Sequence, residues 1–518
     1  MLFNSLEFAF FLPIVFLIYW FVLQKNLKLQ NLFIVIVSYI FYGWWDYRFL
    51  FLIALTSFCS WYSGVLIGKF QGKAEQNIAE APPTPKATPN AEGKTKQSIS
   101  KIILVSNIVL NLAILGFFKY YNFFVDSFID LFSLFNITLQ ASTLKIILPV
   151  GISFYTFQAL SYSIDVYRKK IEPTNDIVAF FAFVSFFPQL VAGPIERATN
   201  LLPQFYKSRK FDYDTAVDGM RQILWGLFKK IVVADNCAIY VNEVFADYTS
   251  QSGSTLLLGA IFFAFQIYGD FSGYSDIAIG TAKLFGIKLL RNFNVPYFSR
   301  DIAEFWRRWH ISLNTWFVDY LYIPLGGSRP YVNPESKHPE LTKKAKVIRN
   351  TFAIFLTSGL WHGANWTFVA WGAYHALLFI PLILLGKNKR FTDTVATGRI
   401  LPNIRECFQM LSTFILVVIG WIFFRAESIT DAFAYLGGIF DKSLLSVPWL
   451  MSKSFYIPLF SGIIIMMFVE YLHRSEEHTF TLRIIDKSYI KWLIYYLLII
   501  YIYTCQVQEE IQFIYFQF

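Results

Sequence analysis

Two histidines stand in an otherwise uncharged stretch of the chain and could carry proton-transfer chemistry. From Thr351 to Gly386 there is no Lys, Arg, Asp or Glu, yet the stretch holds His362 and His375. An imidazole takes up and returns a proton near neutral pH, so it can assist the attack of a hydroxyl on an acyl group. If the chain is helical after Arg349, a rise of about 1.5 Å per residue puts His362 roughly 20 Å into a bilayer core of about 30 Å. We therefore expect His362 to lie in a cavity inside the protein.

The neighbours of His362 suit this chemistry. Trp361 precedes it, Gly363 would allow a close approach of the backbone, and the amide of Asn365 could hydrogen-bond a polarised carbonyl oxygen. On an ideal helix His375 lies about 220° around from His362, so we expect His375 to pack or to orient another group. A structural histidine and a proton relay in a transporter remain alternatives for His362.

Two carboxylates occur in an apolar part of the sequence further upstream. Asp270 and Asp276 lie in a run of glycines, serines and aromatic residues. Acidic groups at membrane depth usually pair or line a wet cavity, so Asp270 is a candidate for lining the site. The alternative is that the two carboxylates cap helix ends or hold a glycine-rich turn.

The segment 292–313 combines arginines, tryptophans and a histidine. Guanidinium groups recognise phosphate in a bidentate manner, so Arg307 and Arg308 could bind the phosphates of a thioester donor. His310 could reach the same cavity as His362 from the cytoplasmic end. The segment is predicted to be an amphipathic helix at the cytoplasmic surface, with its tryptophans as interfacial anchors, and the alternative to phosphate binding is that this helix only anchors the protein to the membrane surface.

The composition places these residues in a polytopic membrane protein. Of 518 residues, 55% are hydrophobic and 15% are charged, whereas a soluble chain carries about 25% charged residues. Apolar runs recur at Leu6–Leu23, Leu32–Trp45, Phe49–Gly68, Ile102–Phe118, Ile146–Val166, Ile177–Ile195, Ala216–Val233, Ser254–Tyr268, Phe352–Leu360 continuing into Trp366–Leu385, Met410–Phe424, Tyr456–Leu472 and Trp492–Cys505. We predict an all-α integral membrane protein with roughly eleven or twelve membrane segments, some of them re-entrant or broken.

Basic residues in the loops predict the orientation of the chain. Lys25 follows the first apolar run, several lysines follow the third, and Arg168 follows the fifth. Because such residues concentrate in cytoplasmic loops, we expect the N-terminus outside, with Leu6–Leu23 as a retained first span. The Pro-rich segment 70–100 holds few large apolar residues and is predicted to be a flexible cytoplasmic loop, within a single membrane-embedded domain over residues 1–518.

The composition also bears on partners and metals. The net charge of +10 fits loops that face anionic lipid, so membrane lipids and not nucleic acid are the expected partner. The four cysteines form no CxxC pair and the six histidines are scattered, so we expect no metal site. An exporter of an acylated or lipid-linked sugar species, or a scaffold of a polymer-export complex, would also have many spans and buried polar groups.

Several motifs together resemble the membrane-bound O-acyltransferase family. They are Val191-Ala-Gly-Pro-Ile-Glu196, Gly269-Asp-Phe-Ser-Gly-Tyr-Ser-Asp276, Phe305-Trp-Arg-Arg-Trp-His310-Ile-Ser-Leu313, Tyr320-Leu-Tyr-Ile-Pro-Leu-Gly-Gly327, Leu360-Trp-His362-Gly363 and Trp371-Gly-Ala-Tyr-His375. The resemblance covers most of the chain and is to the bacterial branch that contains the alginate and peptidoglycan O-acetylation membrane subunits.

The resemblance implies a funnel through the membrane, with His362 as the hallmark catalytic histidine and His310 as the second one. It implies transfer of acetyl from a cytoplasmic thioester, acetyl-CoA, with no bound cofactor, in a bacterial plasma membrane. It also implies an extracytoplasmic partner of the SGNH-hydrolase type that modifies a polysaccharide or cell-wall polymer. Transfer of D-alanyl from a carrier-protein thioester to teichoic acid stays open as an alternative.

Overall fold

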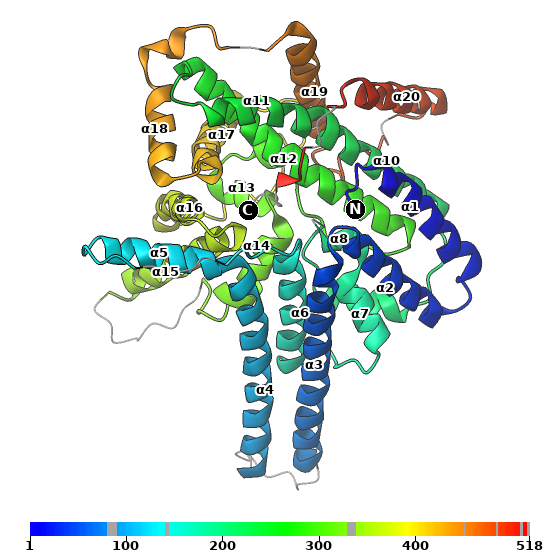
Figure 1. Cartoon of the computed structure of the whole chain (residues 1–518). Coiled ribbons are helices and arrows are strands. Elements are labelled where there is room, and N and C mark those ends of the chain that lie inside the picture. The colour runs from blue at the N-terminus through cyan, green and yellow to red at the C-terminus, as the bar shows by residue number, and fades with distance from the viewer. Residues whose placement is uncertain are drawn as a thin grey trace. The chain divides into compact units, whose positions relative to one another are not determined.

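The computed structural model describes residues 1–79, 91–139, 144–191, 193–328, 338–449, 451–482, 485–507 and 511–514. Within these ranges the chain is helical and contains no strand, so the prediction of an all-α protein is confirmed (Figure 1). The chain divides into two compact units. One comprises Met1–Ala216 with Ala282–Leu289, and the other Val217–Thr281 with Leu290–Phe518. The single membrane-embedded domain stays a prediction.

The helices of the first unit are α1 (Leu6–Leu17), α2 (Leu27–Gly43), α3 (Leu50–Ala79), α4 (Ala91–Leu115), α5 (Tyr121–Ser133), α6 (Ile152–Tyr167), α7 (Ile177–Ser185), α8 (Phe187–Leu190) and α9 (Ala198–Leu201), and the start of α10 (Tyr213–Leu227). The second unit holds α11 (Asp235–Ala246), α12 (Gly253–Leu284, whose last turn belongs to the first unit), α13 (Ile302–Arg308), α14 (Ile311–Phe317), α15 (Pro339–His362), α16 (Trp366–Leu384), α17 (Ile404–Arg425), α18 (Ile429–Ile439), α19 (Lys453–Leu472) and α20 (Ser488–Thr504).

Six segments of the described chain are long and apolar enough to cross a membrane: Tyr47–Gln71, Thr95–Ser133, Gly253–Leu284, Trp366–Leu384, Ile404–Arg425 and Phe455–Leu472. Three shorter apolar helices are Leu6–Val22, Leu27–Gly43 and Ser488–Thr504. The chain therefore has the architecture of a multi-pass membrane protein. Of the remaining predicted segments, Phe352–Leu360 lies inside α15. The others are shorter or interrupted helices, such as Ile177–Ile195, in which α7 ends at Ser185 and a separate short helix follows.

Helices α3, α4 and α6 pack together in the first unit, and α3 and α4 run side by side (Figure 1). Polar side chains join them: the amide of Asn107 donates to the Ser163 hydroxyl at 2.9 Å, a contact that strengthens helix packing in lipid. The predicted loop 70–100 is too wide, because α3 continues to Ala79 and α4 begins at Ala91. Residues 80–90 lie outside the described residues.

Helix α12 is much longer than the predicted run Ser254–Tyr268, because its glycines serve helix packing and do not form a turn. A Cβ at Gly273 would lie 2.8 Å from the carbonyl oxygen of Gly226 on α10, and one at Gly280 would lie 2.5 Å from the carbonyl oxygen of Gly219. Small residues allow two helix backbones to come this close. The alternative of a glycine-rich turn around Asp270 is therefore wrong.

Helices α15 and α16 form an antiparallel hairpin, which also differs from the prediction. The sequence suggested one continuing helix from Phe352–Leu360 into Trp366–Leu385, whereas the chain reverses directly after His362. A Cβ at Gly359 would lie 2.2 Å from the Phe368 carbonyl oxygen. The expectation that His362 and His375 occupy different faces of one helix is consequently wrong.

Candidate active site

Two histidines from separate parts of the second unit meet in its interior. His310 lies at the break between α13 and α14, and His362 is the last residue of α15. The centroids of their rings are 6.2 Å apart. His310 is 1% exposed and His362 is 4% exposed. The fold therefore unites the two residues that the sequence analysis named as catalytic candidates.

The backbone at His310 is bent into a strained conformation. His310 has φ 46°, in the left-handed region, which costs of order 1–3 kcal/mol for a residue other than glycine. Backbone hydrogen bonds on both sides stabilise this bend: the Ile311 amide donates to the Asn292 carbonyl at 2.8 Å, and the Asn294 amide donates to the Arg308 carbonyl at 2.9 Å. The bend turns the chain so that α13 and α14 are separate helices.

The prediction of one amphipathic surface helix over segment 292–313 is wrong for the same reason. Its tryptophans are not interfacial anchors, because Trp306 is 7% exposed and Trp309 is 1% exposed. Trp309 instead stacks beside Phe305, with ring centroids 5.5 Å apart. The segment is part of the protein core.

Aromatic rings enclose the histidine pair. The ring centroids of Trp361, Trp371 and Phe424 lie 5.1, 5.2 and 5.4 Å from that of His362, and Phe271 lies 4.6 Å from His310. Burial lowers the pKa of His310 to about 3, so this imidazole is neutral at neutral pH. The funnel that the resemblance implies stays a prediction.

His375 lies beside this enclosure and is fully buried. The indole N–H of Trp306 donates to its Nδ1 at 3.3 Å, and its ring centroid is 5.1 Å from that of Trp371. Trp371 thus separates His375 from His362. These contacts support the packing or orienting role expected for His375.

The residues that follow His362 shape the hairpin. A Cβ at Gly363 would lie 2.0 Å from the ring of Phe368, so glycine is needed for this close approach. Asn365 caps α16: its side-chain oxygen accepts from the Thr367 amide at 3.0 Å, and its NH₂ group donates to the Glu427 carbonyl at 3.0 Å. The amide is engaged in the fold, and no contact supports the expected carbonyl-binding role of Asn365.

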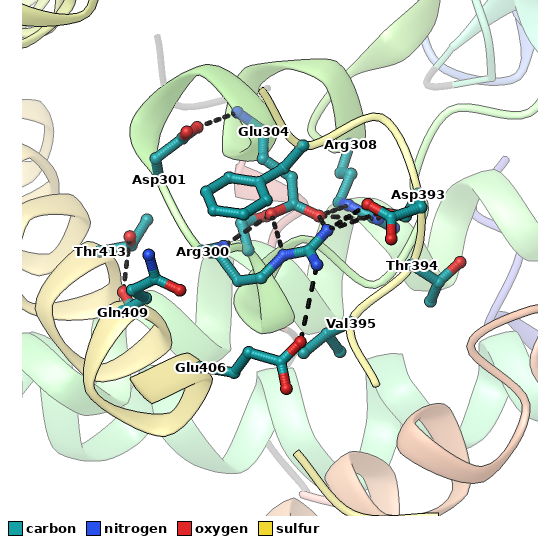
Figure 2. A network of polar contacts seen from close by, with 12 residues as sticks. Arg300, Asp301, Glu304, Arg308, Asp393, Thr394, Val395, Glu406, Gln409 and Thr413 are labelled. Carbon is teal, nitrogen blue, oxygen red and sulfur yellow. Dashed lines mark hydrogen bonds and ion pairs between the residues drawn. The ribbon is translucent and has the colours of Figure 1, made fainter. Parts of the chain in front are cut away.

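A network of buried charges holds α13 in place (Figure 2). The Glu304 carboxylate pairs with Arg300 at 3.0 Å and with Arg308 at 2.9 Å. Arg300 also pairs with Asp393 at 2.9 Å and reaches Glu406 at 3.8 Å. Glu304 lies on α13, Asp393 lies in the segment after α16, and Glu406 lies on α17. Through Arg300, the network therefore ties α13 to that segment and to α17.

The two adjacent arginines that could bind a donor phosphate are engaged by this same segment. Arg307 donates to the carbonyl oxygens of Asn388 and Phe391 at 2.9 and 2.6 Å. Arg308 donates to the Asp393 carbonyl at 2.8 Å in addition to its pair with Glu304. The geometry supports a structural role for both.

Comparisons with known proteins identify the family of this chain. The model of the membrane-bound O-acyltransferase (MBOAT) family matches residues 170–423, which include both histidines. The probable alginate O-acetylase AlgI of Pseudomonas aeruginosa is 37% identical over 442 residues, covering 85% of this chain and 75% of that protein. The chain belongs to the membrane-bound O-acyltransferase family.

Two further relatives differ in acyl group or acceptor. The peptidoglycan O-acetyltransferase of Helicobacter pylori is 34% identical over 471 residues, covering 85% of this chain and 80% of that protein. The teichoic acid D-alanyltransferase of Bacillus subtilis is 27% identical over 286 residues, covering 54% and 69%. Membership in the family makes this chain a multi-pass membrane enzyme that transfers acyl groups to oxygen, and it sets aside the exporter and scaffold alternatives.

Asp270 of this O-acyltransferase is part of a buried ion pair. Its carboxylate lies 2.8 Å from the ammonium of Lys230, which also contacts Asp235 at 2.7 Å. The Ile514 amide donates to the same carboxylate at 2.6 Å. Pairing was one of the two expectations for acidic groups at this depth, and these contacts tie α12 to the C-terminal residues 511–514.

Lys229 and Glu470 were not recognised from the sequence, and they lie beside Asp276, which was. A cavity of about 20 Å³ is lined by Lys229, Ser275, Asp276, Asn292 and Glu470, among others. Lys229 pairs with Asp276 at 2.5 Å. The sequence feature that could have predicted this ion pair is a pair of lysines inside the apolar run Ala216–Val233, where an unpaired charge would be costly.

Proposed function

We propose that this enzyme transfers an acetyl group from a cytoplasmic thioester, acetyl-CoA, across the membrane for O-acetylation of an extracytoplasmic polysaccharide or cell-wall polymer. The observation that carries the proposal is the buried pair of His310 and His362, 6.2 Å apart within the family-matched segment. Acyl transfer to oxygen needs a group that accepts the hydroxyl proton, and an imidazole does this near neutral pH.

In the proposed reaction His362 is the general base. Its ring takes the proton of the acceptor hydroxyl while the oxygen forms a bond to the acyl carbon. The carbon–sulfur bond of the thioester then breaks, and the proton is returned to the departing sulfur. His310, the other histidine of the pair, assists this proton transfer. The aromatic enclosure formed by Trp361, Trp371 and Phe424 supports this step because it keeps water from hydrolysing the thioester.

The acetyl group is favoured over D-alanyl by the relatives. The alginate and peptidoglycan acetylating proteins match 85% of this chain at 37% and 34% identity, whereas the teichoic acid D-alanyltransferase matches 54% at 27%. That weaker match keeps D-alanyl transfer to teichoic acid as a second candidate function, with a carrier-protein thioester as donor.

The remaining parts of the proposal concern the surroundings of the enzyme. We place it in a bacterial plasma membrane with its N-terminus outside, because the basic loops would then face the cytoplasm. An extracytoplasmic partner of the SGNH-hydrolase type would receive the acetyl group and place it on polymer hydroxyls. Membrane lipids surround the apolar helices.

Replacement of His362 tests the proposal directly. In cells that make the enzyme as His362→Ala, we expect base-released acetate from exopolysaccharide and cell wall to fall by about 100-fold. The matched control is His338→Ala, because His338 is exposed and precedes α15. Normal polymer acetylation in the His362→Ala variant, at equal amounts of membrane-inserted protein, would refute the assignment.

The acyl group is identified with a labelled donor. Isolated membranes are supplied with acetyl-CoA labelled in the acetyl group, and label in polymer is compared between wild type and His362→Ala. We expect label in polymer from the wild type alone. Label transferred only from D-alanyl carrier protein would establish the second candidate function instead.

A further inference from the structure

Asn292 lies beside His310 and makes hydrogen bonds in several directions. The residue is fully buried. Its NH₂ group donates to the Ser275 hydroxyl at 3.1 Å. Its side-chain oxygen accepts from the Ser312 hydroxyl at 2.9 Å and lies 3.0 Å from Nδ1 of His310. Asn292 therefore touches the imidazole, the start of α14 and helix α12 at once.

The backbone of Ser312 fixes which way the Asn292 amide points. The Ser312 N–H lies 3.4 Å from the side-chain oxygen of Asn292, and a backbone N–H can only donate a hydrogen bond. An amide rotated by 180° would place two donors against each other at this position. The atom of Asn292 that faces His310 is therefore the oxygen, as the hydrogen-bond network requires.

The orientation of the amide sets the protonation pattern of His310. A carboxamide oxygen carries no hydrogen, so Nδ1 of His310 must supply the hydrogen of this contact. A neutral imidazole with its hydrogen on Nδ1 has its lone pair on Nε2. In this tautomer Nε2 can accept a proton or a hydrogen bond, and it cannot donate one to a developing oxyanion.

We propose that Asn292 is a positioning residue that holds His310 in the Nδ1-protonated tautomer, so that Nε2 acts as an acceptor during acyl transfer. The catalytic role assigned to His310 here rests on the proposed function. It extends that function by stating that Nε2 of His310 accepts, and does not donate, a hydrogen bond or proton. Ser275 supports Asn292 from α12 by holding the NH₂ group of the amide away from the imidazole.

Several titratable groups lie near the contact between Asn292 and His310. His362 is the titratable ring beside His310. Behind Asn292, the small cavity is lined by Lys229, Asp276 and Glu470, together with Arg291, Glu477 and His478. Lys229 lies 2.5 Å from Asp276 and 3.9 Å from Glu470, so the charges of these three groups partly compensate one another.

The tautomer of His310 can be measured independently of enzyme activity. Full-length protein in lipid, labelled with ¹⁵N in its six histidines, gives side-chain nitrogen signals by solid-state NMR, and His310→Asn identifies those of His310. We expect the signal pattern of an imidazole protonated on Nδ1 in the wild type. In Asn292→Leu, which has no oxygen to accept the hydrogen, we expect this pattern to be lost. An Nε2-protonated His310 in the wild type would overturn the inference.

Two variants connect the tautomer with the reaction. Acetyl transfer in isolated membranes should fall about 100-fold in Asn292→Leu. Asn292→Asp keeps an acceptor against Nδ1 and adds a negative charge that favours the imidazolium. Its transfer should therefore persist at high pH, with the acidic limb of the pH–rate profile moved to higher pH.

The results of these measurements can overturn the inference about Asn292 separately from the proposed function. Transfer within about twofold of wild type in Asn292→Leu, or an unshifted pH profile in an active Asn292→Asp, would overturn the inference. If Asn292→Leu does not insert, the Asn292→Asp profile and the wild-type NMR pattern decide. Absence of acetyl transfer in the wild type would refute the proposed function, while the NMR pattern would still test the tautomer. Ser275→Ala, which leaves the oxygen on His310 in place, should change the rate far less than Asn292→Leu.

Discussion

At the scale of single residues, His310 and His362 come within 6.2 Å of each other, between ring centroids, in the interior of the second unit. His362 could be named from the sequence because an imidazole in a long uncharged stretch has few ordinary explanations. Its distance from His310 could not, because that distance depends on a left-handed backbone bend and on a helix reversal. The partners of Arg307 and Arg308 could not be foreseen either, because, apart from Glu304 and the Asn294 carbonyl, they are backbone carbonyls of a segment about 80 residues away in the chain.

The buried charge network gives a residue-scale prediction. Glu304→Gln leaves Arg300 and Arg308 buried without their shared carboxylate, which should destabilise the enzyme by about 3 kcal/mol. The fraction of protein that stays monodisperse after heating in detergent measures this effect. Asp393→Asn is the control, because the Asp393 side chain is 58% exposed and such pairs contribute about 0–1 kcal/mol. Equal heat resistance of the two variants would contradict the central place of Glu304 in the network.

At the scale of helices, the sequence predicted the positions of the apolar segments well, but not the residues at which the helices begin and end. Helices α17, α19 and α20 lie close to their predicted segments, because long apolar runs leave the chain little choice in lipid. The α15–α16 reversal and the length of α12 were missed. In both places a glycine is compatible with a turn and with a close contact between helices. Which of the two forms depends on the helix that packs against it.

The glycines of the α15–α16 hairpin give an element-scale prediction. A Cβ at Gly359 or Gly372 would lie 2.2 or 2.3 Å from a carbonyl oxygen of the facing helix, so the backbones would have to separate. Gly359→Ala and Gly372→Ala should each cost about 1–3 kcal/mol and shift His362 relative to His310. Heat resistance in detergent and polymer acetylation should both decrease.

Gly437 offers the matched control for these two variants. It lies inside α18, and a Cβ there would meet nothing within 4 Å. Gly437→Ala should leave acetylation unchanged and raise stability by about 0.5–1 kcal/mol, because alanine favours the helix. If the hairpin variants behave like Gly437→Ala, the close backbone contact does not govern the position of His362.

At the scale of the whole molecule, the orientation in the membrane is open to a labelling experiment. Tyr47 is exposed at the start of the segment Tyr47–Gln71, Lys28 is exposed in the first turn of α2, and Arg168 is exposed directly after α6. In a background without the four native cysteines, Tyr47→Cys should react with an impermeant maleimide in intact spheroplasts. Lys28→Cys and Arg168→Cys should react only after permeabilisation. The reverse pattern would place the N-terminus in the cytoplasm.

The indole rings around the histidine pair also give the enzyme a built-in optical reporter. Trp361 lies 5.1 Å from His362 and 5.8 Å from His310, measured between ring centroids. A positively charged imidazole quenches the fluorescence of an indole at such short range, whereas a neutral one does so weakly. The emission difference between wild type and Trp361→Phe would therefore follow the charge of this pair in real time, including when an acyl donor binds.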